Sequence, residues 1–308
     1  MIESLVHAQS LVKRFGDFTA VDTVDFEVAP GEVFGFLGPN GAGKSSIMRM
    51  IGAVSPITAG TLTVFGLDPK DDGAEIRGRI GVVPQENLLD MELTVSENLL
   101  IYGRYFDIPR SVIKERMTEL IDFAQLGEKA DAKVEDISGG MQRRLTIARS
   151  LINEPRLVLL DEPTTGLDPQ ARHVLWDRLY RLKQQGVTLI LTTHYMDEAE
   201  QLCDRLVVMD QGKIVAEGSP RGLIREYATR DVVELRFPVG VQDTIVDTLE
   251  PLADRTEVLP DRVLLYTTDG DATMRAVNAA GLEPETVVER RSSLEDVFLR
   301  LTGRSLID

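Results

Sequence analysis

The stretch that most constrains this chain is GPNGAGKS, from Gly38 to Ser45. It fits the phosphate-binding pattern G-x-x-x-x-G-K-S/T, in which Gly38 and Gly43 are the framing glycines. The apolar run VFGFL at 33–37 predicts a buried strand before it, and the apolar spacing at 46–51 predicts a helix after it. A strand, a glycine-rich loop and a helix in that order favour a nucleotide phosphate site over the alternative, an ordinary glycine-rich turn.

The chemistry of such a loop follows from its backbone. Glycines admit positive φ and keep side chains away, so successive N–H groups can turn inward around an anion. The start of the helix adds unpaired N–H groups and the positive end of its dipole. Lys44 offers a cation to the β- and γ-phosphates, and the Ser45 hydroxyl is a hard oxygen ligand for Mg²⁺. The stretch therefore predicts a nucleotide bound together with Mg²⁺.

Length and charge narrow the class of protein. The 308 residues suffice for one large or two ordinary domains, and the net charge of −16 argues against a nucleic-acid binder. A single cysteine, Cys203, excludes an internal disulfide framework and fits a reducing compartment. The N-terminus lacks the features of a signal peptide, and no apolar stretch approaches the roughly 20 residues that span a bilayer. We therefore expect a protein that does not itself cross a membrane but is free to bind one.

The chain before and after the loop shows further strands. Residues 2–37 alternate apolar and polar positions between tight turns, which predicts antiparallel strands. Within them Phe15 is either a strand-packing residue or a stacking platform for an adenine ring. Strands are also predicted at 61–64 and 79–83. Gln85 follows the second of these, at a strand edge where α/β proteins place ligand contacts, although a lone loop glutamine is commonly just solvated.

A helical block and two polar loops come next. Residues 94–126 have helical spacing, and Thr94 with Glu97 fits a capping box, so we expect a helical insert here. Ser138, Gly139 and Gly140 precede a predicted helix at 141–152 and form either a second anion cradle or an ordinary N-cap. Asp168, in the turn GLDP, is either a functional residue or a simple turn residue.

Two apolar runs end in ionisable residues. The run LVLL at 157–160 predicts a buried strand and is followed by Asp161 and Glu162, which are costly to bury unless they meet a cation or a reacting water. Asp161 suits Mg²⁺, and Glu162 suits a base that orients or deprotonates water. The strand predicted at 188–193 ends at His194. A lone histidine is more often structural, but this is another strand end that presents a polar group, which favours function.

With these residues in order, the chain resembles the ATP-binding subunit of an ABC transporter from about Leu5 to Arg225. The resemblance covers the adenine-stacking aromatic Phe15, the Walker A loop GPNGAGKSS, the glutamine loop at Gln85, the signature ISGGM, Walker B (LVLLDE), the D-loop (TGLD) and the switch histidine His194. The departures are small: Ile137 replaces the usual leucine, and Met141 stands where the signature often has glutamine.

The resemblance implies an α/β fold: an ABC-type P-loop ATPase with an antiparallel β subdomain and a helical insert at about 90–155, within a domain spanning 1–227. It implies ATP hydrolysis, with Glu162 activating water and His194 sensing the γ-phosphate. The residues expected to contact ATP are Phe15, Gly38, Pro39, Asn40, Gly41, Ala42, Gly43, Lys44, Ser45, Ser46, Gln85, Ser138, Gly139, Gly140 and Asp168. The expected Mg²⁺ ligands are Ser45, Gln85 and Asp161.

The resemblance also implies partners and a place in the cell. Two copies of the chain are expected to pair head to tail around ATP, and Gln85 to link this homodimer to a coupling helix of a separate membrane permease. The chain would then lie in the cytoplasm, peripheral on the inner face of the cell membrane, with no nucleic acid bound. The segments 97–106 (ENLLIYGRYF) and 171–179 (ARHVLWDRL) are most similar to nodulation-type lipo-oligosaccharide exporter ATPases, with drug-resistance exporters as the wider group. The cargo expected is accordingly lipid-linked, lipo-oligosaccharide or drug-like.

Two rival functions remain open from the residues alone. A soluble ABC-type ATPase acting on the ribosome or on nucleic acid would ordinarily carry two cassettes or long coiled-coil insertions, and the chain has neither. A binding module without catalysis is disfavoured because Lys44, Asp161, Glu162 and His194 are all present.

The region 228–308 predicts a second, accessory or regulatory domain. Its strands are predicted at 232–237, 256–259, 262–267 and 286–291, and its helices at 244–253, 272–280 and 294–303. The first six elements follow the order β-α-β-β-α-β, which is typical of a ferredoxin-like α+β domain. The last helix has an apolar stripe that either completes the domain's own core or contacts a partner.

Overall fold

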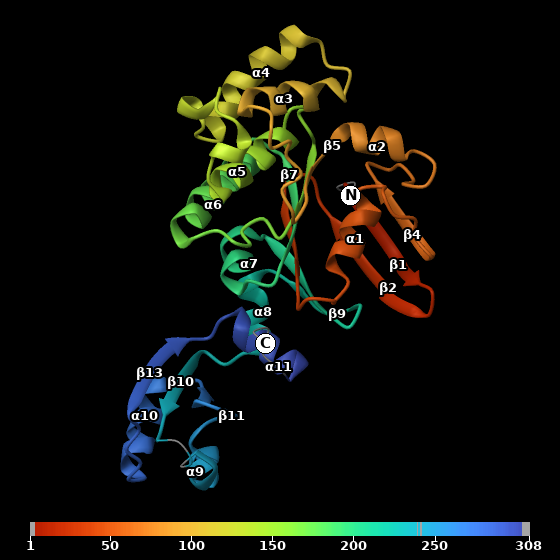
Figure 1. Ribbon diagram of the computed structural model, residues 1–308. Coiled ribbons are helices and arrows are strands. Elements are labelled where there is room, and N and C mark those ends of the chain that lie inside the picture. The colour runs from red at the N-terminus through yellow and green to blue at the C-terminus, as the bar shows by residue number, and fades with distance from the viewer. Residues whose placement is uncertain (1–3, 239, 241, 304–308) are drawn as a thin grey trace. The chain divides into compact units, whose positions relative to one another are not determined.

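The computed structural model describes residues 4–238, 240 and 242–303 (Figure 1). The chain divides into two compact units, Met1–Glu217 and Gly218–Asp308. Residues 1–3 of the first predicted domain and 304–308 of the second lie outside the described residues. Among the helices of the described ranges, none combines the length and the apolar character needed to span a membrane.

A six-stranded sheet forms the centre of the first unit. Its strands follow the order β5-β6-β7-β3-β8-β9. Their bounds are β3 Val33–Leu37, β5 Ile80–Val83, β6 Leu157–Asp161, β7 Thr188–Thr193, β8 Arg205–Asp210 and β9 Lys213–Gly218. The strands from β5 to β8 pair in parallel. Strands covered on both faces are buried at successive positions, and VFGFL, LVLL and TLILTT are accordingly buried at every residue rather than at alternating ones.

A smaller antiparallel sheet stands beside it, with the order β2-β1-β4. Its strands are β1 Val6–Phe15, β2 Phe18–Val28 and β4 Ala59–Val64. The antiparallel prediction for residues 2–37 is therefore right for β1 and β2 and wrong for β3, which lies in the parallel sheet. All five β3 residues are buried, and a strand without an exposed face belongs inside a sheet that is covered on both sides.

The helices of the first unit include the predicted insert. Their bounds are α1 Lys44–Ile51, α2 Gly73–Arg79, α3 Val95–Arg104, α4 Arg110–Phe123, α5 Gly139–Ser150, α6 Pro169–Gln184 and α7 Met196–Leu202, with short 3₁₀ turns at Gly127–Lys129 and Val134–Asp136. α3, α4 and α5 contact one another around their own apolar cluster. The capping box at the start of α3 is confirmed: the Thr94 hydroxyl accepts from Glu97 N at 3.1 Å, and Thr94 N donates to Glu97 Oε2 at 2.8 Å.

The second unit has the predicted ferredoxin-like order. It begins with α8 Pro220–Tyr227 and continues with β10 Asp231–Arg236, α9 Gln242–Leu249, a 3₁₀ turn Glu250–Leu252, β11 Arg255–Leu259, β12 Arg262–Thr267, α10 Gly270–Ala279, β13 Thr286–Arg291 and α11 Leu294–Thr302. The sheet order is β11-β12-β10-β13, with antiparallel pairs throughout. In α11 the stripe residues Leu294, Val297 and Phe298 are buried, and the neighbouring Leu299 packs against Val232, Leu264 and Tyr266. The helix also contacts α8 of the same unit.

The boundary between the units differs from the sequence-based one. We predict the division after residue 227, whereas the compact units divide at Glu217, ten residues earlier. The physical reason is that α8 contacts α11, and the Arg300 guanidinium donates to the Tyr227 carbonyl at 2.8 Å. Sequence patterns give the motifs of the first domain, but they do not show which neighbour an amphipathic helix covers.

Candidate active site

The glycine-rich loop lies between β3 and α1, as its flanking pattern predicts. Gly43 has φ of 102°, and a Cβ at this position would lie 2.3 Å from the Ala20 carbonyl oxygen. A Cβ on Gly38 would lie 2.3 Å from the Met209 carbonyl oxygen. Neither position admits a side chain, so the two framing glycines are required by the close approach of neighbouring backbone. α1 then fixes the loop by burying Ile47, Met50 and Ile51 in the core of the first unit.

Lys44 turns back over this loop. Its Nζ donates to the carbonyls of Gly38 at 2.7 Å and Pro39 at 3.0 Å, and it lies 3.9 Å from Glu162 Oε1. The side chain is buried, and this burial lowers the pKa of Lys44, while the carboxylates Glu162 and Asp161 act in the opposite direction. A cation held inside a ring of backbone groups is the arrangement that receives phosphate oxygens.

Hard oxygen ligands meet at the end of β6. The Ser45 hydroxyl donates to Asp161 Oδ1 at 3.2 Å, and the Thr192 hydroxyl donates to the same oxygen at 2.5 Å. Among the described residues no group of three or more His, Cys, Asp and Glu side chains forms a metal cage. One carboxylate and one hydroxyl beside a phosphate loop instead fit Mg²⁺, which is commonly held by few protein ligands together with substrate phosphates. The residues present therefore fit this ion.

Three elements bring polar groups to the Glu162 carboxylate. Gln85, after β5, donates from Nε2 to Oε2 at 3.3 Å, and the Thr165 hydroxyl donates to the same oxygen at 3.1 Å. His194, after β7, places Nδ1 3.2 Å from Oε1. Glu162 itself has φ of 46°, a left-handed conformation that is uncommon for a residue with a side chain and that recurs at functional sites. Parallel strands align their carboxyl ends, which is why residues far apart in sequence converge here.

The side chains of Ser138 in the signature and Asp168 in the D-loop make local hydrogen bonds, each at the start of its own helix. The Ser138 hydroxyl caps α5 by accepting from Met141 N at 3.3 Å, and Asp168 caps α6 by accepting from Ala171 N at 2.9 Å. The N-cap predicted as one alternative for Ser138 is thus present, and Asp168, for which a turn residue is the alternative, also caps a helix. Ser138 is exposed, and a Cβ placed on Gly140 would meet Leu167 and Ala171, near the D-loop.

Phe15 pairs with Phe18 at the end of the β1–β2 hairpin. The two residues are 51% and 62% exposed, so neither is a packing residue of the core. Lys13 Nζ lies 4.7 Å from the Phe15 ring centroid. β2 passes against the phosphate loop two residues beyond Phe18, where the Ala20 carbonyl oxygen faces Gly43. Because the Phe15 ring is exposed on the hairpin that contacts the phosphate loop, stacking on an adenine ring stays a prediction for this residue.

Sequence reasoning missed three side chains of the site. Thr192 donates to the Asp161 carboxylate, and Thr165 donates to the Glu162 carboxylate. For Thr192 the one signal in the sequence is a hydroxyl within the buried strand TLILTT. Arg143 appears in the sequence only as one of several basic residues after the signature. In the structure it is 3% exposed, and this burial lowers its pKa to about 10, so that it is charged at neutral pH.

Comparison with known families agrees with this geometry. A family described as ABC transporter matches residues 21–165. A second family, the C-terminal domain of the nodulation factor export protein NodI, matches residues 243–303. The two matches fall in the two compact units of the chain.

Whole-chain relatives and solved structures extend the match. Proteins named Nod factor export ATP-binding protein I are 50% identical in a Rhizobium species, covering 96% of this chain and 95% of that protein, and 45% identical in Cupriavidus metallidurans, covering 99% of both. A structure of cbiO1 from Clostridium perfringens, part of the ABC transporter complex cbiONQ, has a TM-score of 0.68 at 26% identity and covers 73% of this chain and 92% of its own. A dimeric ATP-binding cassette in a post-hydrolysis state, bound to ADP and Pi, has a TM-score of 0.64 at 27% identity and covers 70% of this chain and 98% of its own. None of these matches favours the rival function on ribosomes or nucleic acid. The chain therefore belongs to the ABC transporter family, as an ATP-hydrolysing subunit of the export type.

Proposed function

We propose that this chain drives export by binding Mg·ATP at Gly38–Ser45 and hydrolysing it with Glu162 as the base. The observation that carries the proposal is the convergence of Lys44, Gln85 and His194 on the two Glu162 oxygens beside the phosphate loop. The loop amides and Lys44 bind the β- and γ-phosphates. Glu162 accepts a proton from the attacking water, and His194 is placed to hydrogen-bond the γ-phosphate as it separates.

Mg²⁺ is assigned to Ser45 and Asp161, with Gln85 as a further ligand through its amide oxygen. When bound there, the ion would supply positive charge that offsets the negative charge of the phosphates. The Thr192 hydroxyl donates to Asp161 Oδ1 at 2.5 Å and so helps to fix the direction of this carboxylate.

Removal of divalent ions is expected to abolish turnover. Charge stabilisation by a metal is worth several kcal/mol, so EDTA should reduce the rate of phosphate release by more than about 10²-fold, and excess Mg²⁺ should restore it. Phosphate release from the purified chain is the measurement. Full turnover in EDTA would contradict the assignment of Ser45 and Asp161.

A head-to-tail homodimer is proposed for the working state. Ser138 and Gly139 are exposed at the start of α5, where unpaired N–H groups and the helix dipole favour an anion. In this arrangement the signature of one copy covers the γ-phosphate held by the loop of the other. Phe15 stacks on the adenine ring, and Asp168 lies at the seam between the two copies.

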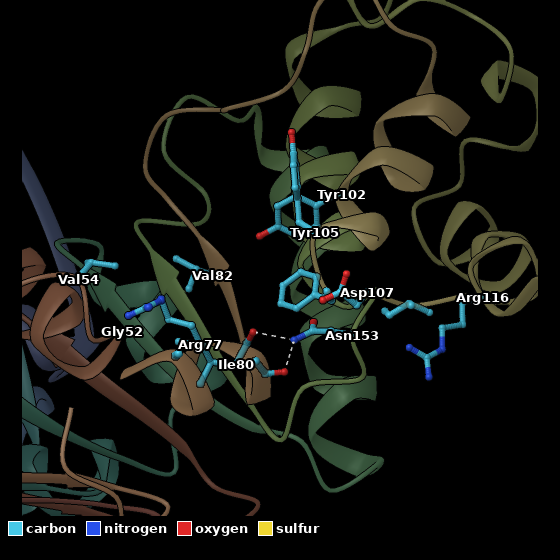
Figure 2. Close-up of a pocket in the computed structure, with 14 residues that line it drawn as sticks. Gly52, Val54, Arg77, Ile80, Val82, Tyr102, Tyr105, Asp107, Arg116 and Asn153 are labelled. Atoms are coloured by element: carbon cyan, nitrogen blue, oxygen red, sulfur yellow. Dashed lines mark hydrogen bonds between the residues drawn. The ribbon is translucent and has the colours of Figure 1, made fainter. Parts of the chain in front are cut away.

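A groove for the permease is proposed on the side of the Gln85 loop. It has a volume of about 670 Å³ and runs between α2 and β5 on one side and α3 with the start of α4 on the other. Figure 2 shows Tyr102 and Tyr105 on its helical side and Val54 and Arg77 opposite. Tyr105 is 76% and Val54 67% exposed, and exposed apolar side chains that line one groove support the proposal of a partner surface.

This groove continues toward the loop that carries Gln85. An adjoining pocket of about 410 Å³ shares Val82, Tyr102 and Tyr105 and reaches Pro84, the residue before Gln85. A permease segment with apolar side chains that binds here would touch the loop that carries Gln85, whose side chain donates to Glu162. In this proposal the chain lies on the inner face of the cell membrane, and its cargo contacts the permease. The relatives are named for Nod factor export, and on that similarity we propose a cargo of the nodulation-factor type.

Tyr105→Asp is expected to release the chain from membranes. A charge at the centre of an apolar interface commonly costs about 2 kcal/mol or more, since the carboxylate must be desolvated. The measurement is the fraction of the chain that sediments with membranes of the producing cells. Tyr180→Asp is the matched control, because Tyr180 is also exposed, at 53%, but lies outside the groove on α6. Equal sedimentation of Tyr105→Asp and wild type would show that the permease docks elsewhere.

A further inference from the structure

One buried guanidinium joins the two loops that flank Glu162. Arg143 lies on α5, one turn into the helix that begins at the signature. Its side chain donates to five main-chain carbonyls: Pro163 at 2.8 Å, Asp161 at 3.1 Å, Glu162 at 3.1 Å, Pro84 at 2.5 Å and Gln85 at 3.3 Å. Three of these carbonyls belong to the last residue of β6 and the turn after it, and two belong to the loop after β5.

We propose that Arg143 is a positioning residue that sets the rate of hydrolysis by fixing the backbone on both sides of the Glu162 carboxylate. The inference rests on the proposed role of Glu162 as the base. Glu162 has φ of 46°, a conformation that costs free energy and persists only when its surroundings hold it. Arg143 binds the carbonyl of this residue and those of its two neighbours, so it holds the turn at the strained position itself.

The second loop is held in the same way. Arg143 Nη1 binds the carbonyls of Pro84 and Gln85, and the Gln85 side chain then donates to Glu162 Oε2 at 3.3 Å. One rigid group therefore fixes the carboxylate through its own backbone and fixes the amide that touches it. Because the guanidinium is planar and carries five donors, it can bind carbonyls of two loops at once. A lysine ammonium has three donors at one point and cannot bridge them in this way.

A simple structural role for Arg143 predicts something different. If the side chain only stabilised the fold, its replacement would lower the melting temperature, and ATP binding and turnover would fall together. A positioning role predicts a lower kcat with unchanged ATP affinity, because the phosphate loop, Gly38–Ser45, receives no hydrogen bond from Arg143. A misplacement of about 1 Å at a reacting group can cost about 10²-fold in rate.

The deciding experiment compares Arg143→Lys with wild type in the full-length purified chain. We expect kcat for Mg·ATP to fall about tenfold to 10²-fold, with KM and the binding of a fluorescent ATP analogue unchanged within about twofold. Arg144→Lys is the matched control: it is the next residue of α5, and its guanidinium donates to Gln125 Oε1 at 3.0 Å on the helix surface. That variant should keep the wild-type kcat.

Chemical rescue provides the second readout. Arg143→Ala should regain turnover when methylguanidinium is added and not when sodium is added at equal ionic strength. A wild-type kcat in Arg143→Lys would overturn the proposal, and so would a joint loss of ATP binding and turnover without rescue. An inactive wild-type chain would instead count against the proposed hydrolysis site, so the two failures are distinguishable.

Discussion

Glu162→Gln is expected to slow ATP hydrolysis by about 10²-fold or more and to leave ATP binding intact. The amide keeps the shape of the side chain and one oxygen for the Gln85 and Thr165 donors, so the site retains its geometry. It cannot accept a proton from water, and a general base typically contributes 10²–10⁴-fold in rate. Lys44 also loses its nearby charged partner, which leaves more of its charge for the phosphates.

The variant should therefore accumulate ATP-bound closed dimers. Size-exclusion chromatography with Mg·ATP measures the dimer, and release of labelled phosphate measures turnover. Glu75→Gln is a suitable control, because Glu75 is an exposed residue of α2 that pairs with Arg79. If Glu162→Gln released phosphate at the wild-type rate, another group would have to be the base.

The sequence singles out the residues of the proposed catalytic site because each lies next to a local pattern. One pattern is a glycine-rich loop between a strand and a helix, and another is a carboxylate or a histidine directly after an apolar run. Each pattern puts a polar group at the end of a strand. Parallel pairing of the strands then brings these ends together. Arg143 has no such pattern, since five of its acceptors are backbone carbonyls that lie 18 to 59 residues away in the sequence. Main-chain acceptors look alike in any sequence, so long-range contacts of this kind need coordinates.

The same reasoning explains the misassigned strand and boundary. The sequence predicts β3 together with the antiparallel strands that it closely follows, yet its pairing partners β7 and β8 come more than 150 residues later. α8 was assigned to the first domain because it follows the motifs directly. Its apolar residues Pro220 and Leu223 are buried in the second unit, where the helix contacts α11. Both predictions rest on proximity in the sequence. The structure depends instead on strand pairing and helix contacts between residues that are far apart in the sequence.

Mixing two inactive variants is expected to restore one ATP site in each mixed dimer. Lys44→Ala removes the cation of the phosphate loop, and Ser138→Ala removes the signature hydroxyl without touching its own chain's loop. In a head-to-tail homodimer, either variant alone has two defective sites. Mixed in equal amounts, about half of the dimers are heterodimers by random pairing. Each heterodimer then holds one doubly defective site and one intact site.

The structure adds a requirement to this experiment, because Ser138 also caps α5. Loss of an N-cap costs about 1 kcal/mol by itself, so Ser138→Ala needs a control that removes a cap elsewhere. Ser219→Ala is such a control, since Ser219 caps α8 by accepting from Gly222 N at 3.1 Å. It should leave nucleotide trapping unchanged.

Trapping of nucleotide at one site per heterodimer is the readout, because coupled turnover can stay low when only one site works. Wild-type behaviour of Ser138→Ala alone would exclude the signature from the site. An absence of trapping in heterodimers that demonstrably form would exclude the head-to-tail arrangement. Mixing has different effects on the two kinds of defect. A defect in the cap of α5 stays with its own chain. A defect in a shared site is absent from the site that combines the intact halves of the two chains. Rescue in the mixture therefore assigns Ser138 to the ATP held by the other copy.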